Sequence, residues 1–156
     1  MKPKFQSKQS LIINSPLQKV WDFSQDLSRI VEYHPRVNRV ELISGKRFRE
    51  VDISYQCHLS DGKNCCTEKD IEIIPLEKIV TVIPSDTMGL SNLLPDYLVE
   101  TTFAKINEKT TQVTISHFYS SSKWKVWLLN LIIKRKVAKE TIEMLNAAKK
   151  AIENEH

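Results

Sequence analysis

Glycine is scarce in this chain, with three residues in a length of 156. Phosphate-binding loops of the P-loop and dinucleotide types place several glycines close together, because the backbone must approach the phosphate closely. The nucleophile turn of serine hydrolases likewise needs glycines on both sides of the serine. Gly45, Gly62 and Gly89 lie too far apart to build any of these motifs. The sequence therefore excludes nucleotide-binding and hydrolase signatures of this kind.

Long apolar runs and disulfide patterns are also missing. No apolar run approaches the roughly 20 residues that span a bilayer, and the N-terminal MKPKFQSKQS lacks the apolar centre of a signal peptide. The three cysteines form an odd set without the spacing of a disulfide framework, which is typical of a reducing compartment. A net charge of +4 is too small to indicate nucleic-acid binding by itself. We therefore expect a cytoplasmic protein without a nucleic-acid partner, and the length predicts one domain over residues 1–156.

The predicted elements are one strand, two short helices, a series of strands and one long helix. The first helix follows Ser15-Pro16, a pair typical of helix starts. The second ends before Pro35, because a residue that precedes proline avoids helical geometry. Strands are predicted over residues 5–14, 39–43, 50–59, 64–74, 79–83, 97–106 and 112–119. The last segment, residues 123–153, contains neither glycine nor proline and is predicted to form one helix. This order indicates an α+β domain.

Apolar and polar residues alternate along the predicted strands, which assigns one face of each strand to the core. The inward set is Val51, Ile53, Tyr55, Cys57, Val99, Phe103, Ile115 and His117. In the hairpin around Gly62, a three-residue loop would pair Cys57 with Cys65 and turn an acidic row to solvent. We therefore predict an exposed row that consists of Glu68, Asp70 and Glu72.

The long C-terminal helix carries apolar residues on two sides. One stripe is predicted to lie in the concave sheet, and it consists of Trp124, Trp127, Leu128, Leu131, Ala138, Ile142 and Leu145. A second set falls on the opposite side and consists of Val126, Leu129, Ile133 and Val137. We expect the loop at residues 88–94, which supplies three leucines, to cover this second set. The alternatives are a second subunit, in a homodimer, or weak contact with an anionic membrane, which the basic residues Lys134–Lys136 would favour.

Several local patterns resemble those of the START-like superfamily, also called the polyketide cyclase/dehydrase and lipid-transport (SRPBCC) superfamily. They are Ile12–Pro16 with Lys19–Trp21 and Asp26, Tyr33–Pro35 with Val37 and Val40-Glu41, Glu68–Ile74, and the long terminal helix. The resemblance covers nearly the whole chain, although Asn107–Thr110 stands where the family usually has a glycine-rich turn. It implies the helix-grip fold, a curved antiparallel sheet of about six or seven strands around a long C-terminal helix. Two short helices follow the first strand in this fold.

The members of this superfamily include lipid carriers, hormone sensors and cyclases, so the resemblance implies a cavity and not one chemistry. We predict binding or transport of a hydrophobic small molecule, lipid-like, polyketide or aromatic, between the sheet and the C-terminal helix. Apolar cavities with a few placed polar groups are typical of such sites. The residues predicted to line it are Ile53, Tyr55, Cys57, Tyr97, Val99, Thr101, Phe103, Ile115, His117, Tyr119, Trp127 and Leu131.

His117 is the candidate for ligand hydrogen bonding or for acid–base work, since histidine titrates near neutral pH. Two alternatives to a binding protein stay open. The first is an enzyme of the polyketide cyclase or dehydratase type that uses this histidine. The second is a protein-interaction module with a filled core and no cavity.

No metal site or cofactor is predicted. The three cysteines and His58 are potential metal ligands. The predicted alternation places Cys57 and Cys65 on the inner face of the hairpin, which leaves the other two ligands outside. Ligands on two faces of a sheet cannot converge on one tetrahedral ion. We therefore interpret the cysteines as small, semi-apolar strand residues.

Overall fold

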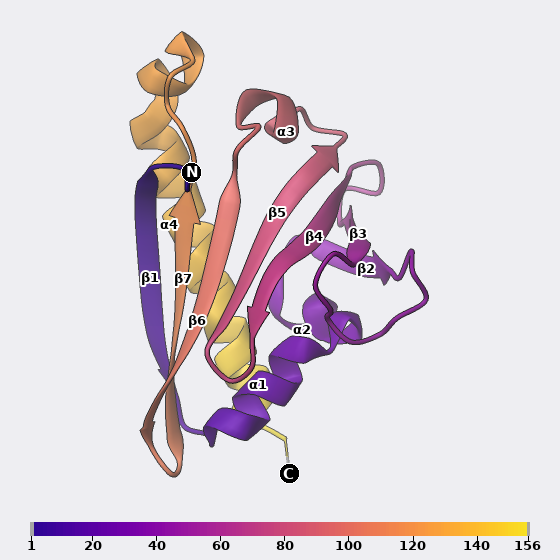
Figure 1. Cartoon of the computed structure of the whole chain (residues 1–156), viewed down its shortest axis with the longest axis vertical. Coiled ribbons are helices and arrows are strands. Elements are labelled where there is room, and N and C mark those ends of the chain that lie inside the picture. The colour runs from indigo at the N-terminus through magenta and orange to yellow at the C-terminus, as the bar shows by residue number, and fades with distance from the viewer. Residues whose placement is uncertain (1, 156) are drawn as a thin grey trace.

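The computed structural model describes residues 2–155, and within this range a seven-stranded antiparallel sheet curves around one long helix (Figure 1). The sheet order is β1-β7-β6-β5-β4-β3-β2. The strands are β1 (Phe5–Ile13), β2 (Val37–Glu41), β3 (Ser54–Leu59), β4 (Cys65–Ile74), β5 (Lys78–Asp86), β6 (Leu98–Asn107) and β7 (Thr110–Phe118). The helices are α1 (Leu17–Gln25), the 3-10 turn η1 (Leu27–Arg29), α2 (Ile30–Tyr33), α3 (Leu90–Leu93) and α4 (Trp124–Glu153).

This architecture confirms the predicted α+β helix-grip fold. In Figure 1, α4 runs along one face of the sheet, and α1 and α2 lie beside its C-terminal half. The strand predicted over residues 50–59 begins only at Ser54, so Val51 lies outside the sheet and is exposed. Ile53 is half-buried just before β3. Within residues 2–155, no helix combines the length and the apolar character that a membrane crossing requires.

Helix α1 forms where the sequence indicates, immediately after Pro16. The backbone N–H of Val20 donates to the Pro16 carbonyl at 3.1 Å and closes the first turn. Val20, Trp21 and Phe23 are buried on one side of the helix. Trp21 meets Phe103 of β6 edge to face, with ring centroids 5.2 Å apart, an arrangement that aromatic pairs prefer. This contact holds α1 against the sheet.

The β3–β4 hairpin has a different register from the predicted one. Cys57 lies opposite Cys66, and the hairpin closes through a four-residue loop at residues 60–63. The Asp61 carboxylate accepts hydrogen bonds from the backbone N–H groups of Lys63 and Asn64 at 3.0 and 2.9 Å, which favours the longer loop. The prediction that pairs Cys57 with Cys65 is therefore wrong. Because a one-residue shift turns every side chain to the other face, Cys66 points inward.

A buried ion pair accounts for the acidic residues on the inner face of β4. Asp70 is 1% exposed and accepts two hydrogen bonds from Arg49, at 2.8 and 2.9 Å. It also accepts one from the Thr81 hydroxyl at 2.7 Å. A buried charge is tolerated when a partner and hydrogen bonds replace its hydration. The predicted exposed row is thus wrong for Asp70 and for the half-buried Glu68, whereas Glu72 is exposed as predicted.

Helix α4 is rotated relative to the prediction. Its buried residues are Val126, Thr141, Leu145 and Ile152. Leu145 is the one buried member of the predicted core stripe among the described residues, and Ala138 is half-buried. The remaining five are exposed, namely Trp124, Trp127, Leu128, Leu131 and Ile142. The N-terminal half of the helix is apolar on all sides, so its periodicity does not select the face that packs on the sheet.

The loop before β6 covers part of the second apolar set of α4, as predicted. Val126 is fully buried against Leu94 and Tyr119, and Ile133 packs on the same cluster. Leu90 and Leu93 complete that cluster. The loop leaves the other two members uncovered: Leu129 is 46% exposed, and Val137 lines the cavity between α4 and the sheet.

Candidate functional site

A cavity of about 270 Å³ lies between the inner face of the sheet and α4. Its walls are mostly apolar and come from α1, α2, strands β3 to β7, α3 and α4. Examples are Phe23, Ile79, Val99, Val113, Ile115 and Leu145. A hydrophobic small molecule would replace water against these side chains, which is the main source of affinity in apolar pockets.

The structure brings five of the predicted residues together on the cavity wall. They are Tyr97, Val99, Thr101, Ile115 and His117, all from β7 or from β6 and the residue before it. Four others are buried outside the lining, namely Tyr55, Cys57, Phe103 and Tyr119. Ile53 also lies outside the lining. The prediction that Trp127 and Leu131 line the cavity is wrong, because their side chains are exposed to solvent.

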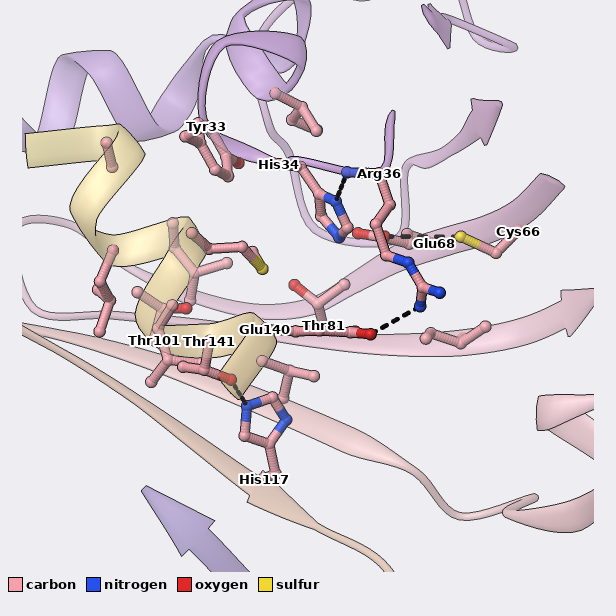
Figure 2. Close-up of a pocket in the computed structure, with 18 of the residues that line it drawn as sticks. Tyr33, His34, Arg36, Cys66, Glu68, Thr81, Thr101, His117, Glu140 and Thr141 are labelled. Atoms are coloured by element: carbon pink, nitrogen blue, oxygen red, sulfur yellow. Dashed lines mark hydrogen bonds and ion pairs between the residues drawn. The ribbon is translucent and has the colours of Figure 1, made fainter. Parts of the chain in front are cut away.

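His117 is held at the cavity wall by two hydrogen bonds. Its Nε2 atom lies 2.8 Å from the Thr141 hydroxyl (Figure 2), and its Nδ1 atom lies 2.7 Å from the Tyr97 hydroxyl. Thr141 donates its own hydrogen to the Val137 carbonyl at 2.7 Å, so it can only accept from His117. The imidazole therefore carries its proton on Nε2, and Nδ1 accepts the Tyr97 proton.

This chain of donors has consequences for proton transfer. Burial lowers the pKa of His117 to about 4, so the ring is neutral at neutral pH. Burial also raises the pKa of Tyr97 above its ordinary value. Both His117 nitrogens are engaged, and the Tyr97 proton is directed at His117. Among Tyr97, His117 and Thr141, the polar atom that stays available to a ligand is the Tyr97 oxygen, which can accept a hydrogen bond.

A second polar group enters the cavity from β4. The Tyr55 hydroxyl accepts from Arg49 at 2.7 Å and donates to Glu68 Oε2 at 2.9 Å. The buried pair of Arg49 and Asp70 thus orients the Glu68 carboxylate through Tyr55. Figure 2 shows Glu68 and His117 well apart in the cavity. The Glu68 carboxylate and the Tyr97 oxygen beside His117 can therefore bind different polar groups of one ligand.

The loop after α2 and the middle of α4 each contribute a charged residue to the cavity lining. Arg36 from the loop and Glu140 from α4 form an ion pair of 2.7 Å (Figure 2). The Arg36 backbone N–H donates to His34 Nδ1 at 3.3 Å, and burial lowers the pKa of His34. Sequence reasoning missed these three residues, because the loop carries no periodic pattern and Glu140 belongs to the polar part of the helix.

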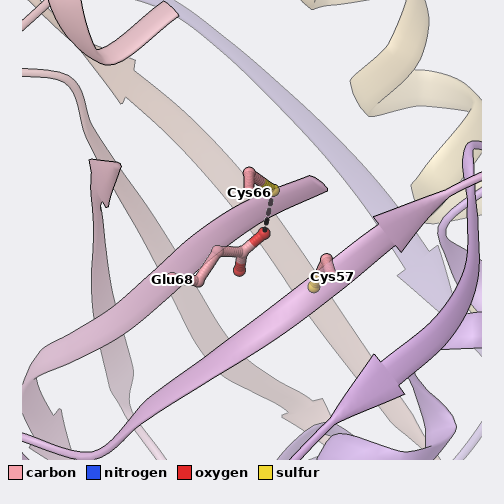
Figure 3. Close-up of side chains that lie close together, drawn as sticks. All are labelled: Cys57, Cys66 and Glu68. Carbon is pink, nitrogen blue, oxygen red and sulfur yellow. Dashed lines mark hydrogen bonds between the residues drawn. The ribbon is translucent and has the colours of Figure 1, made fainter. Parts of the chain in front are cut away.

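Cys57, Cys66 and Glu68 form a compact group on the inner face of the β3–β4 hairpin (Figure 3). Their sulfur and oxygen atoms lie within 4.8 Å of one another, and Cys66 Sγ lies 3.8 Å from Glu68 Oε1. The hydrogen bond with Cys66, and then burial, raise the pKa of the Cys57 thiol. The three groups are potential zinc ligands. A tetrahedral zinc site here would need a fourth ligand, and both Cys57 and Cys66 would have to lose their protons. The geometry fits a chain of thiol donors that ends on the carboxylate at least as well.

The fold is shared with solved structures of low sequence identity. One is a norcoclaurine synthase from Thalictrum flavum, with a TM-score of 0.73, 14% identity, and 97% of this chain and 96% of that chain covered. An aromatase/cyclase from a Streptomyces species has a TM-score of 0.69 and 14% identity, with 94% and 92% covered. A START superfamily protein from Mycobacterium smegmatis has a TM-score of 0.70 and 10% identity, with 96% and 97% covered. No family model and no curated protein sequence matches the chain.

Identities this low establish the fold alone. The chain therefore has the START-like, helix-grip fold that its sequence motifs imply.

Proposed function

We propose that this protein binds a small hydrophobic molecule with one or two polar groups in the cavity between the sheet and α4. The observation that carries the proposal is an apolar cavity into which the Tyr97–His117 pair and Glu68 project from opposite parts of the wall. Pockets for small molecules combine such apolar walls with a few placed polar atoms. The polar atoms would orient the ligand, and the walls would supply most of the affinity.

The size of the cavity favours a compact ligand. Its volume of about 270 Å³ lies just below the usual range of roughly 300–1,000 Å³ for ligand pockets. One or two fused rings, or one short acyl chain, suit this space better than a lipid with two long chains. The Tyr97 oxygen and the Glu68 carboxylate are acceptors, so a phenolic or other hydroxyl group on the ligand would match them.

A second candidate function is catalysis of the cyclase or dehydratase type. The observation that favours it is the hydrogen bond of 2.7 Å between Tyr97 and His117 at the cavity wall. Tyr97 could take a proton from a substrate as it passes its own to His117. The low pKa of His117 makes it a weak base at neutral pH, so binding remains the better-supported function. Turnover by wild type that is lost in Tyr97→Phe, with ligand affinity retained, would favour the enzyme.

Ligand binding can be tested with a substitution that fills the cavity. A substitution on the outer face of the same strand serves as its control. Thr101 lines the cavity, whereas Thr102 is the next residue of β6 and faces the other side of the sheet. We expect a small neutral probe such as 2-naphthol, whose two fused rings and hydroxyl suit the cavity, to bind wild type and Thr102→Trp, and to bind Thr101→Trp at least tenfold more weakly. Equal binding to both variants, with both folded by circular dichroism, would overturn the proposal. Mass spectrometry of extracts from natively purified protein would then identify the natural ligand.

A further inference from the structure

The N-terminal half of α4 presents an apolar face to solvent. Its members are 62% to 72% exposed, and they are Trp124, Trp127, Leu128, Leu131 and Ile132. We call these five residues the α4 apolar face. In Figure 1 this end of the helix, in orange, extends beyond the ends of β1 and β7. Contiguous exposed apolar surface marks an interaction site on a water-soluble domain, because its burial is favourable.

Basic residues accompany the α4 apolar face. Residues 120–139 contain no aspartate or glutamate, and their basic residues are Lys123, Lys125, Lys134, Arg135, Lys136 and Lys139. Arg135 and Lys139 continue the line of Leu128 and Ile132 along the helix, since residues three and four apart share one side. Within residues 2–155, neither of these two cations forms an ion pair. The charge of this surface is therefore not neutralised inside the chain.

We propose that the α4 apolar face docks on the surface of an anionic lipid bilayer. Tryptophan favours the membrane–water interface, and amphipathic helices bury their apolar side about 5–10 Å into it. Residues 124–132 cover about 12 Å of helix axis, so a tilted helix end can bury them at that depth. The cations of residues 134–139 then lie at the level of the lipid phosphates, which attract them.

A second copy of the chain matches this surface less well. A symmetric contact brings the same residues of two subunits together. It would add the unpaired Arg135 and Lys139 of a second subunit to those of the first beside one small apolar contact, and like charges repel. Anionic lipid supplies both the apolar layer and the opposite charge. The charge pattern thus selects a lipid surface over a homodimer.

Vesicle flotation with the full chain tests the proposal. We expect binding to phosphatidylcholine vesicles that contain phosphatidylserine, and weaker binding at high salt because salt screens the attraction. Each basic residue near an anionic surface contributes about fivefold to the partition constant. Arg135→Glu combined with Lys139→Glu should therefore weaken binding by at least about 25-fold. Both side chains are exposed, so this variant should melt like wild type.

The tryptophans supply a second readout. Trp21 is buried, whereas Trp124 and Trp127 are exposed, so insertion of the α4 apolar face should shift the emission of the latter two to the blue. Trp124→Ser combined with Trp127→Ser should abolish flotation and the shift. Ile106→Ser is the matched control, because Ile106 is also an exposed apolar residue but lies near the β6–β7 turn.

Three results would overturn the proposal. The first is no flotation of wild type with anionic vesicles. The second is equal flotation of wild type and the Arg135→Glu, Lys139→Glu variant. The third is a blue-shifted emission without vesicles together with a dimer in solution, which would mean that a second copy covers the face. Thr101→Trp should float like wild type, since the cavity is not part of this surface.

Discussion

The buried ion pair of Arg49 and Asp70 should be among the most sensitive sites in the fold. The two side chains are 8% and 1% exposed, and the Asp70 carboxylate accepts three hydrogen bonds, from Arg49 and Thr81. Asp70→Leu would leave the guanidinium buried without its counter-charge. Removal of one partner of a buried ion pair costs about 3–5 kcal/mol. That loss is a large part of the roughly 5–15 kcal/mol that stabilises an ordinary domain.

Urea unfolding of wild type, Asp70→Leu, Arg49→Met and the double variant would measure this effect. We expect the double variant to be more stable than either single variant, because it leaves no charge unpaired. Glu108→Ala is the control, since its ion pair with Lys105 is exposed and should contribute about 1 kcal/mol or less. A decrease of less than about 1 kcal/mol in the free energy of unfolding of Asp70→Leu would refute the reasoning, because an unpaired buried charge destabilises a fold by more than that.

Three further predictions concern the helix, the histidine and the thiols. Leu145→Ala should lower the free energy of unfolding by about 2–5 kcal/mol, whereas Trp127→Ala should change it by about 0.5 kcal/mol or less in denaturant melts; the reverse order would mean that α4 packs by its other face. The pKa of His117 is lowered to about 4 from an ordinary 6.5, so the unfolded chain binds the extra proton first as pH falls. Stability should therefore decrease from about pH 6.5 to pH 4, by about 3 kcal/mol, and His117→Gln should remove that part of the slope. Cys66 should react with a small maleimide more slowly than Cys65, because it lies on the buried inner face, and a bound ligand should slow it further.

The sequence alone determined the order of the elements and the inward face of β6 and β7. Pro16 and Pro35 bound the two short helical segments through local backbone geometry. The alternation along β6 and β7 places Val99, Ile115 and His117 on the inner face, because side chains of a strand alternate regardless of what they pack against. These signals depend on local backbone geometry, so they can be interpreted without knowledge of the tertiary fold.

The register of the β3–β4 hairpin was decided by tertiary structure. Alternation predicted that acidic residues face solvent, and it placed Asp70 outside for that reason. The cation that makes its burial possible, Arg49, lies 21 positions away and outside any strand. A contact between such distant residues leaves no periodic trace in the sequence. For the same reason the polar side of the cavity at Glu68 was missed.

The orientation of α4 was also decided by packing. In its N-terminal half, apolar residues occur on both sides of the helix, so either Trp127 or Val126 could have faced the core. Leu94 and Tyr119 bury Val126, which leaves the tryptophans in solvent. The ion pair of Arg36 and Glu140 depends on the same placement, since Arg36 reaches Glu140 only when this side of α4 faces the sheet. Local patterns therefore specified which segments fold, and contacts between distant segments specified which of their faces meet.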